Sequence, residues 1–339
     1  MNGHVPGGRE TSTSVLIPEF IAANGGVATH EQLLTVTSRK AIAKQVQTGA
    51  LVRVFQGVYA LEHPDTATRL AALDLLAHKP VVACMGTAAS LYGFDTEDDG
   101  KLHILDPGIR MRPKPGLVVH QRIGAPLRRI EGRLATAPGW TAVEEARALR
   151  RPRVMAILDA ALRSGACTQE DIEKAILEQK GRRGIVKVRT LLPFADPRSE
   201  SAMESETRLV FLEFGLQPEE LQYEVTDHLG QLWRVDFAWP TVRFAVEYDS
   251  VEWHATPEAW KRDRLKSARL RECGWTVLRI VADDVRRHPE NLAAQVAAHL
   301  RAARLAGCAA HLPTGPPAPP TLRAPPRRPW RGHQRPLPT

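Results

Sequence analysis

Apolar positions between residues 14 and 61 follow helical spacing first and strand spacing afterwards. Residues 15–24 predict one short helix, and two more are predicted behind Thr29 and Ser38, residue types that commonly cap helix N-termini. The β-branched and aromatic residues around Gly57 then predict a small hairpin. Three helices followed by a hairpin are the elements of a winged helix-turn-helix.

The middle of the chain mixes both kinds of pattern. Residues 66–130 contain two helical patterns and two strand-like segments, KLHILDP and GLVVHQR, which indicates a small mixed α/β unit, and residues 141–195 are helical in pattern. His103, His120 and Asp106 lie near the strands, but their spacing fits no metal-ligand pattern. We interpret them as strand-face or turn residues and assign the middle region a scaffold role.

Two further segments, LWRVDFAW and VRFAVEYDS, flank Pro240-Thr241 and are rich in strand-forming residues, so they predict an antiparallel hairpin. A two-residue loop would place Asp236 opposite Ala245. Because side chains alternate between the faces of a strand, this register puts Asp236, Glu247 and Asp249 on one face. The other face is predicted to carry Val235, Phe237, Phe244, Val246 and Tyr248.

Composition limits the class of protein. The 339 residues suffice for two or three domains, and 43% apolar residues is ordinary for a globular chain. No apolar run approaches the roughly 18 residues of a membrane span, and the opening residues lack a signal-peptide pattern, so we expect a cytoplasmic protein. The four cysteines are far apart and form no C-x-x-C pair, which indicates neither a disulfide framework nor a zinc knuckle.

The formal net charge of +8 favours polyanion partners, but part of it lies at the C-terminus. From Leu312 onward the chain has ten prolines, five arginines and no acid, a composition that predicts disorder. We predict disordered segments over residues 1–13 and 306–339. The tail either contacts DNA phosphates without sequence preference or is a solvated extension.

Basic residues also gather in the first segment. Arg39, Lys40, Lys44 and Arg53 lie between residues 32 and 61, which contain no acid. Such one-sided charge suits phosphate contact and makes double-stranded DNA the expected partner, although a solvated helix face has the same composition. The stretch from ATHEQLL to GVYAL resembles the N-terminal winged-helix domain of AbiEi-type antitoxins, which implies DNA binding and, as a further partner, a toxin or other protein.

The acidic hairpin indicates chemistry. Clustered carboxylates repel one another and lose hydration, so they reduce stability unless a cation accompanies them. Hard oxygen ligands suit Mg²⁺ or Mn²⁺. An ion held by Asp236, Glu247 and Asp249 would polarise a phosphodiester and lower the pKa of an attacking water, which is nuclease chemistry.

Asp236, ten intervening residues and then Glu247-x-Asp249 resembles the PD-(D/E)XK nuclease fold, in the branch related to very-short-patch-repair endonucleases. The resemblance covers residues 201–300 and implies a metal-dependent endonuclease. Upstream, Glu204 in SAMESETRLVFLEFGL matches the acidic helix position. Downstream, His254 in DSVEWH is a candidate proton donor or orienting residue, with a packed or surface histidine as the alternative.

The chain departs from this pattern at one functional position. The motif lysine is replaced by Asp249, which removes the usual cation near the attacking water. Basic residues of the following helix are candidates to replace that cation, but we favour phosphate contact or a solvated face for them. If these residues contact phosphates, Lys261 and Arg264 are further DNA-binding residues. The helix carries Lys261, Arg262, Arg264 and Lys266.

The sequence therefore predicts a multidomain α+β or α/β protein. A winged helix-turn-helix is expected over residues 14–63, a mixed helical AbiEi-like middle region over 64–196, and a restriction-endonuclease-like mixed sheet flanked by helices over 197–305. The favoured function is DNA binding with metal-dependent phosphodiester hydrolysis. The alternative is an antitoxin-like transcriptional regulator whose nuclease-like domain is inactive and binds a partner. A third hypothesis is a nuclease or toxin that acts on RNA.

Overall fold

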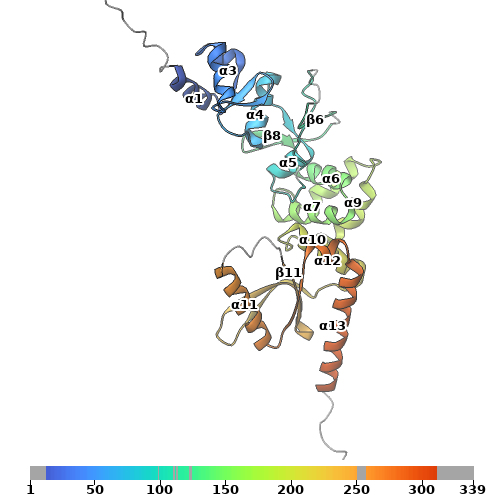
Figure 1. The fold of residues 1–339 in the computed structure, drawn as a ribbon. Coiled ribbons are helices and arrows are strands. Elements are labelled where there is room, and N and C mark those ends of the chain that lie inside the picture. Colours follow the sequence, from blue (N-terminus) through green and yellow to red (C-terminus); the bar gives the residue numbers. More distant parts are fainter. Residues whose placement is uncertain are drawn as a thin grey trace, which may run out of the picture.

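The computed structural model describes residues 13–97, 99–109, 111, 114–121, 124–249 and 257–310. Successive parts of the chain lie one after another, from the N-terminal helices at one end to the last sheet and helix at the other (Figure 1). The described residues form three sheets, of three, five and four strands, together with thirteen α-helices. This mixed α/β content confirms the predicted multidomain α+β class.

The first part contains three helices and a small sheet. The helices are α1 (Thr13–Ala23), α2 (His30–Leu34) and α3 (Arg39–Gln47), and the strands β1 (Ala28–Thr29), β2 (Val52–Phe55) and β3 (Val58–Ala60) pair in the order β1-β3-β2. The caps form as predicted, since Thr29 accepts a hydrogen bond from the Gln32 amide and Ser38 accepts one from the Ala41 amide. Gly57 makes the turn between β2 and β3 with a φ of 81°.

The middle region begins with a five-stranded sheet in the order β6-β5-β4-β8-β7. Its elements are α4 (Thr66–Ala77), β4 (Val82–Ala83), α5 (Met85–Leu91), β5 (Leu102–Leu105), β6 (Leu117–His120), β7 (Leu127–Ile130) and β8 (Arg133–Thr136). Strands β5 and β6, the two predicted strands, pair in parallel, and β7 and β8 form an antiparallel hairpin that the sequence pattern did not predict.

A helical unit follows this sheet. It consists of α6 (Pro138–Ala148), α7 (Arg151–Arg163), α8 (Gln169–Glu178), α9 (Ile185–Leu191) and the 3-10 turn Leu192–Phe194. Helix α7 is its centre, because every residue from Arg153 to Ala161 is buried. Gly184, with a φ of 85°, brings the start of α9 against the end of α6, where a Cβ at this position would lie 2.4 Å from the Arg147 carbonyl oxygen.

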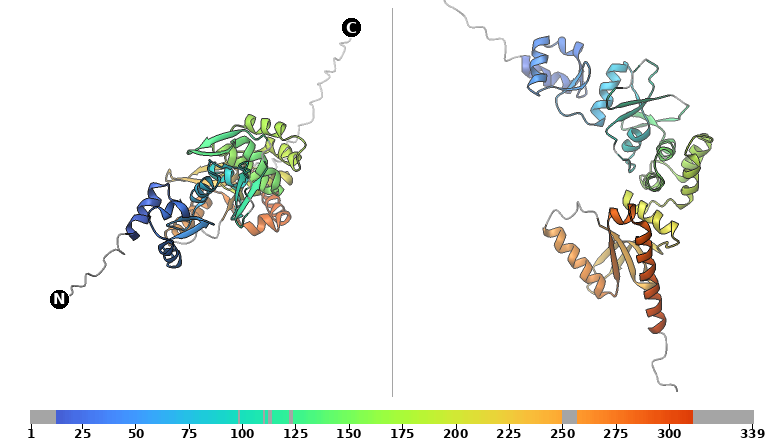
Figure 2. Two further views of the ribbon diagram at one scale, coloured as in Figure 1. Left: turned by 90° about the horizontal axis from the view of Figure 1, so that it is seen from above. Right: turned by 45° about the vertical axis from the view of Figure 1, so that its right-hand side comes forward.

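The last part is a four-stranded sheet in the order β12-β11-β10-β9 with helices on both faces. Figure 2 shows α11 (Pro257–Glu272) and α13 (Pro289–Ala310) on opposite sides of it. Strands β9 (Glu220–Thr226), β10 (Leu232–Trp239) and β11 (Phe244–Tyr248) are antiparallel, whereas β12 (Thr276–Ile280) runs parallel to β11 after the α11 crossover. Helices α10 (Ala202–Glu213) and α12 (Ala282–Arg286) share the α13 face.

The predicted hairpin forms, but its register differs from the expected one. Ala238, rather than Asp236, lies opposite Ala245, because Pro240–Val242 forms a 3-10 turn and Arg243 adopts a left-handed φ of 49°. The prediction assumed a shorter loop. Since the shift amounts to two residues, Asp236 still shares a face with Glu247.

Val235, which was predicted on the apolar face with Phe237, lies on the opposite face of the sheet. Val235 packs with Ala238 and Ala245 on the α11 face, while Phe237 packs with Val246 on the α13 face. Strict alternation is therefore interrupted next to Asp236. The neighbouring strand is distorted at the same level, since Gln222 has a φ of 52° between two regular pairs.

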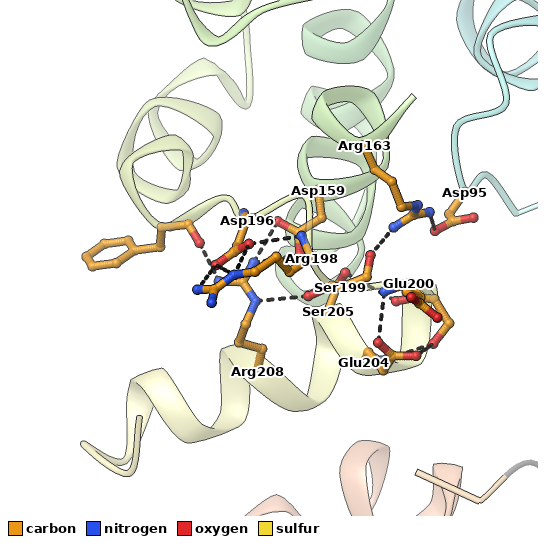
Figure 3. A network of polar contacts seen from close by, with 12 residues as sticks. Asp95, Asp159, Arg163, Asp196, Arg198, Ser199, Glu200, Glu204, Ser205 and Arg208 are labelled. Carbon is orange, nitrogen blue, oxygen red and sulfur yellow. Dashed lines mark hydrogen bonds and ion pairs between the residues drawn. The ribbon is translucent and has the colours of Figure 1, made fainter. Parts of the chain in front are cut away.

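Helix α10 joins the last sheet to the middle helices. Glu206 is 1% exposed and receives hydrogen bonds from Arg153 of α7 and Arg286 of α12, and Arg208 donates at 2.6 Å to the fully buried Asp159 of α7. Figure 3 shows the Arg208–Asp159 pair at this joint, with Glu204 at the start of the same helix. The middle helices therefore fix the position of α10.

The predicted chain ends lie mostly outside the described residues. Helix α13 extends to Ala310, five residues beyond the predicted domain boundary at 305, and residues 311–339 are not described. None of the described helices is long and apolar enough to cross a membrane. Cys84, Cys167 and Cys273 are free thiols.

The contact at Gly184 predicts a large loss of stability in Gly184→Ala. The new methyl group would meet the Arg147 backbone and an L residue would be held at positive φ, so we expect the free energy of unfolding to fall by about 2–4 kcal/mol in thermal or urea denaturation. Gly181→Ala is the matched control, since Gly181 has a φ of 83° and a Cβ added there would meet nothing within 4 Å. The control should lose only about 1 kcal/mol, and equal losses in both variants would contradict the close-approach account.

Candidate functional site

A small cavity of about 150 Å³ opens where β10, β11 and β12 meet α11. Its lining is almost entirely polar and includes the three carboxylates that the sequence singled out. The lining residues are Asp236, Glu247, Tyr248, Asp249, Asp263, Lys266 and Arg279. The structure thus brings Asp236, Glu247 and Asp249 together, as predicted from strand alternation, and adds residues from the next helix and strand.

Asp236 lies in the middle of β10, at the break in strand alternation. Its Oδ2 accepts a hydrogen bond of 2.8 Å from the Tyr248 backbone N–H, which ties β10 to the end of β11. Burial, the neighbouring Glu204 and then Glu247 raise the pKa of Asp236 to about 7. Loss of hydration and neighbouring negative charge thus outweigh the stabilisation that the Tyr248 amide and Lys266 give to the charged form of Asp236.

Glu247 is the most buried carboxylate of the cavity, at 7% exposed. Its Oε1 contacts Lys266 Nζ, and its Oε2 lies 3.8 Å from Nη2 of Arg279. Lys266 belongs to α11 and Arg279 to β12, where it pairs in register with Glu247. Two cations therefore reach this carboxylate from the elements that follow it in the chain.

Arg279 also organises the rim of the cavity. Its guanidinium binds both oxygens of Asp263, donates to Ser267 Oγ at 2.9 Å and lies 3.6 Å from Oδ2 of Asp249. Sequence reasoning missed both Arg279 and Asp263. The available signal was the spacing of Asp263, Lys266 and Ser267 at i, i+3 and i+4, which places them on one side of a helix.

Glu204 lies behind the cavity rather than in its lining. It occupies the first turn of α10, is 9% exposed, and accepts a hydrogen bond from the Glu200 amide (Figure 3). Ser201 Oγ and Gln222 Nε2 also donate to it. Burial raises its pKa. Because Glu204 in turn raises the pKa of Asp236, the two carboxylates are electrostatic neighbours.

The donor set of the cavity fits a divalent cation in charge and chemistry. Four carboxylates and two cations line it, which leaves a formal charge of −2, and the half-buried acid Asp236 has a raised pKa. In the described part of the chain, however, no three His, Cys, Asp or Glu side chains are already arranged around one point for a metal ion. Lys266 contacts Glu247 and Arg279 lies 3.6 Å from Asp249 instead, so metal binding at Glu247 requires Lys266 to move.

The predicted DNA-contacting residues lie in two places. Arg39, Lys40 and Lys44 of α3 and Arg53 of β2 are exposed, and the Arg53 guanidinium is 6.0 Å from the centre of the Tyr59 ring. On α11, Lys261 and Arg264 are exposed as well. Lys266, for which we favoured a phosphate-contact or solvent-facing role, instead lies in the cavity. His254 lies outside the described residues.

Comparisons with known proteins agree with two of the resemblances. A model of the AbiEi antitoxin C-terminal domain matches residues 81–194, and the restriction-endonuclease-like model REase_MTES_1575 matches residues 219–300, which contain the whole cavity. Two similar relatives are the Mycobacterium tuberculosis proteins MT2308 (strain CDC 1551 / Oshkosh) and Rv2248 (strain ATCC 25618 / H37Rv), both described as uncharacterized. Each is 60% identical over 270 residues, which span 80% of this chain and all of the relative.

The raised pKa of Asp236 predicts pH-dependent stability. The folded protein holds this proton more tightly than the unfolded chain, whose aspartate pKa is about 3.9, so this contribution to stability is lost as pH rises through about 7. Asp236→Asn avoids the loss. In metal-free buffer we expect the variant to be about 1–3 kcal/mol more stable than the wild type at pH 8 and nearly equal to it at pH 4, where the wild-type carboxyl group is protonated in the folded state and about half protonated in the unfolded chain.

Urea denaturation at both pH values, with EDTA present, measures this difference. Glu224→Gln is a suitable control because Glu224 is an exposed carboxylate on the adjacent strand β9, and it should change stability little at either pH. An Asp236→Asn protein that is less stable than the wild type at pH 8 would contradict the electrostatic description of the cavity.

Proposed function

Because the chain belongs to the same family as the Mycobacterium tuberculosis proteins MT2308 and Rv2248, and residues 219–300 match a restriction-endonuclease-like model, we propose that it is a DNA-binding, metal-dependent endonuclease. In this proposal the last domain has the PD-(D/E)XK fold and hydrolyses phosphodiester bonds. The observation that carries the proposal is the polar cavity in which Asp236, Glu247 and Asp249 converge from two paired strands.

The names of these relatives assign no activity, so the chemistry rests on the cavity. Asp236, Glu247 and Asp249 would hold Mg²⁺ or Mn²⁺ through hard oxygen atoms. When bound, such an ion polarises the phosphoryl oxygen, lowers the pKa of a coordinated water and stabilises the leaving oxygen. The net charge of −2 on the lining groups supports the binding of one divalent ion.

The reaction is a hydrolysis without redox change. The oxygen of a water molecule bonds to phosphorus and one P–O ester bond breaks, which leaves a phosphate monoester and an alcohol. The proton that the water loses is balanced by the proton that the leaving oxygen gains through solvent. Asp236 and Glu247 orient the reacting groups, and Glu204 keeps the negative potential at Asp236 high without lining the cavity.

Duplex DNA is the proposed substrate because exposed cations lie both in the first part of the chain and on α11 beside the cavity. The order of α1, α2, α3 and the β2–β3 hairpin supports a winged helix-turn-helix, with α3 carrying Arg39, Lys40 and Lys44 toward phosphates. The exposed Lys261 and Arg264 of α11 lie on the helix that borders the cavity, where they would contact a phosphate backbone.

A second candidate function is an antitoxin-like regulator that binds DNA and a toxin or other protein but does not cut. The AbiEi antitoxin match over residues 81–194 favours it, and so does Asp249 at the position of the motif lysine. In that case the nuclease-like domain would serve as a partner-binding module. The two candidates differ in one measurable property, which is metal-dependent cleavage.

Cleavage of supercoiled plasmid in Mg²⁺ or Mn²⁺ tests the proposal directly. We expect wild-type protein to nick the plasmid, and Asp236→Ala and Glu247→Ala to slow nicking by about 10³-fold or more while leaving duplex binding within about twofold, because they remove metal ligands and not phosphate contacts. Glu224→Ala, which removes an exposed carboxylate from the same sheet, should cleave like the wild type.

The same assay decides between the candidates. Specific binding of one operator sequence by the wild-type protein, with no cleavage in either metal, would overturn the nuclease and leave the regulator.

The winged-helix proposal predicts the salt dependence of DNA binding. Lys40 and Lys44 lie one turn apart on the exposed side of α3, so Lys40→Ala/Lys44→Ala should weaken duplex binding about tenfold or more and reduce the slope of log K against log salt by about 2. Fluorescence anisotropy at several salt concentrations measures both quantities. Lys174→Ala/Lys180→Ala removes the same charge from exposed positions of the middle region and should leave the slope unchanged. Equal slopes in all three proteins would place the DNA contact elsewhere.

A further inference from the structure

The cavity contains a lysine, Lys266, although the Glu247-x-Asp249 motif has no lysine of its own. The third residue of Glu247-x-Asp249 is acidic, so β11 itself provides no ammonium group. Lys266, one of two cations in the lining, approaches from α11 and contacts Glu247 Oε1. An ammonium group therefore reaches the buried carboxylate from a helix instead of from the strand.

The position of Lys266 is built into the packing of α11. Its side chain is 24% exposed, whereas Lys261, Arg262 and Arg264 of the same helix are exposed residues. Leu270, one turn further along the helix, is 1% exposed and packs against Val235, Ala238 and Ala245 of the sheet. Lys266 thus belongs to the side of α11 that faces the sheet, and burying part of its stem on this side offsets the loss of side-chain freedom.

Arg279 holds this turn of the helix in place. It binds Asp263, three residues before Lys266, and Ser267, the residue after it. Because Arg279 belongs to β12, these hydrogen bonds fasten α11 to the sheet on both sides of Lys266 along the chain. The guanidinium of Arg279 binds Asp263 and Ser267 and lies beside Glu247 and Asp249. Of the two cations in the lining, Lys266 is therefore the one that can turn toward a ligand.

We propose that Lys266 takes the place of the lysine missing from the strand motif and contacts the scissile phosphate and the attacking water. This inference rests on the proposed nuclease function and adds to it the residue that supplies the positive charge. In metal-free protein the ammonium group neutralises Glu247. During hydrolysis Lys266 keeps its proton and stabilises the negative charge that develops on the phosphoryl oxygens.

The proposal predicts opposite effects on metal binding and on cleavage. Lys266 lies beside a carboxylate that would bind the metal, so its positive charge competes with the ion for Glu247. Removing that charge with Lys266→Met should therefore tighten Mn²⁺ binding, by about three- to tenfold. The same substitution should slow plasmid nicking by about 100-fold or more at saturating Mn²⁺, because the phosphate loses its protein cation.

Calorimetric titration of full-length protein with Mn²⁺, in the absence of DNA, measures the first effect independently of activity. Arg271→Met is the matched control, because it removes one positive charge from an exposed position of the same helix and should change neither quantity. Lys266→Arg restores the charge and should return Mn²⁺ affinity toward the wild-type value with partial recovery of nicking. Thermal denaturation of each variant, and Lys266→Gln as a second neutral variant, separates these effects from loss of folding.

Each result has a distinct meaning. Tighter Mn²⁺ binding with slower nicking supports the assignment. Unchanged Mn²⁺ affinity with weaker DNA binding would overturn it in favour of a plain phosphate contact, and weaker Mn²⁺ binding with a lower melting temperature would overturn it in favour of a structural ion pair. If wild-type protein and Lys266→Met both bind no Mn²⁺, the proposed metal site itself fails. If the wild type binds Mn²⁺ without nicking, the nuclease function fails while the metal site stands.

Discussion

Loss of hydration and the close spacing of carboxylates set the electrostatics of the cavity in the last domain. Asp236, Glu204 and Glu247 lie close enough that burial and their mutual charge raise the pKa of Asp236 to about 7. Placing Asp236 beside Glu204 and Glu247 costs stability, and Lys266 and Arg279 offset part of the negative charge on Glu247. A divalent ion in the proposed site would supply further positive charge. The unfavourable electrostatics of the metal-free protein are, in our account, the source of its affinity for metal.

Elements distant in sequence bring cations to these carboxylates and offset part of their negative charge. The α11 crossover brings Lys266 to Glu247, and the parallel strand β12 brings Arg279 beside both Glu247 and Asp263. On the opposite face, α10 carries Glu204 toward Asp236, while Glu206 and Arg208 of the same helix bind the middle region. The AbiEi-like helices and the nuclease-like sheet thus share one helix, and a shift of the middle region would be transmitted to the start of α10.

The sequence predicted those features that depend on neighbouring residues. Thr29 and Ser38 cap their helices, and the carboxylates Glu247 and Asp249 reach the same cavity as Asp236. The hairpin register was wrong because nothing local in Pro240–Val242 announces a 3-10 turn closed by a left-handed Arg243. Lys266 was only one of four candidate cations on its helix, and Arg279 was missed. Their places at the cavity depend on which side of α11 faces the sheet and on the pairing of β12 with β11, which residue patterns alone did not determine.

The position of a bound divalent ion would show whether Asp236 and Glu247 are the metal ligands that we propose. Crystals of the protein grown with Mn²⁺ would locate it by anomalous scattering. Our account predicts one strong peak in direct coordination with Asp236 and Glu247, with the Lys266 ammonium group moved away from Glu247. A peak at another site, or a cavity in which Lys266 still contacts Glu247 and no ion is bound at saturating Mn²⁺, would contradict it.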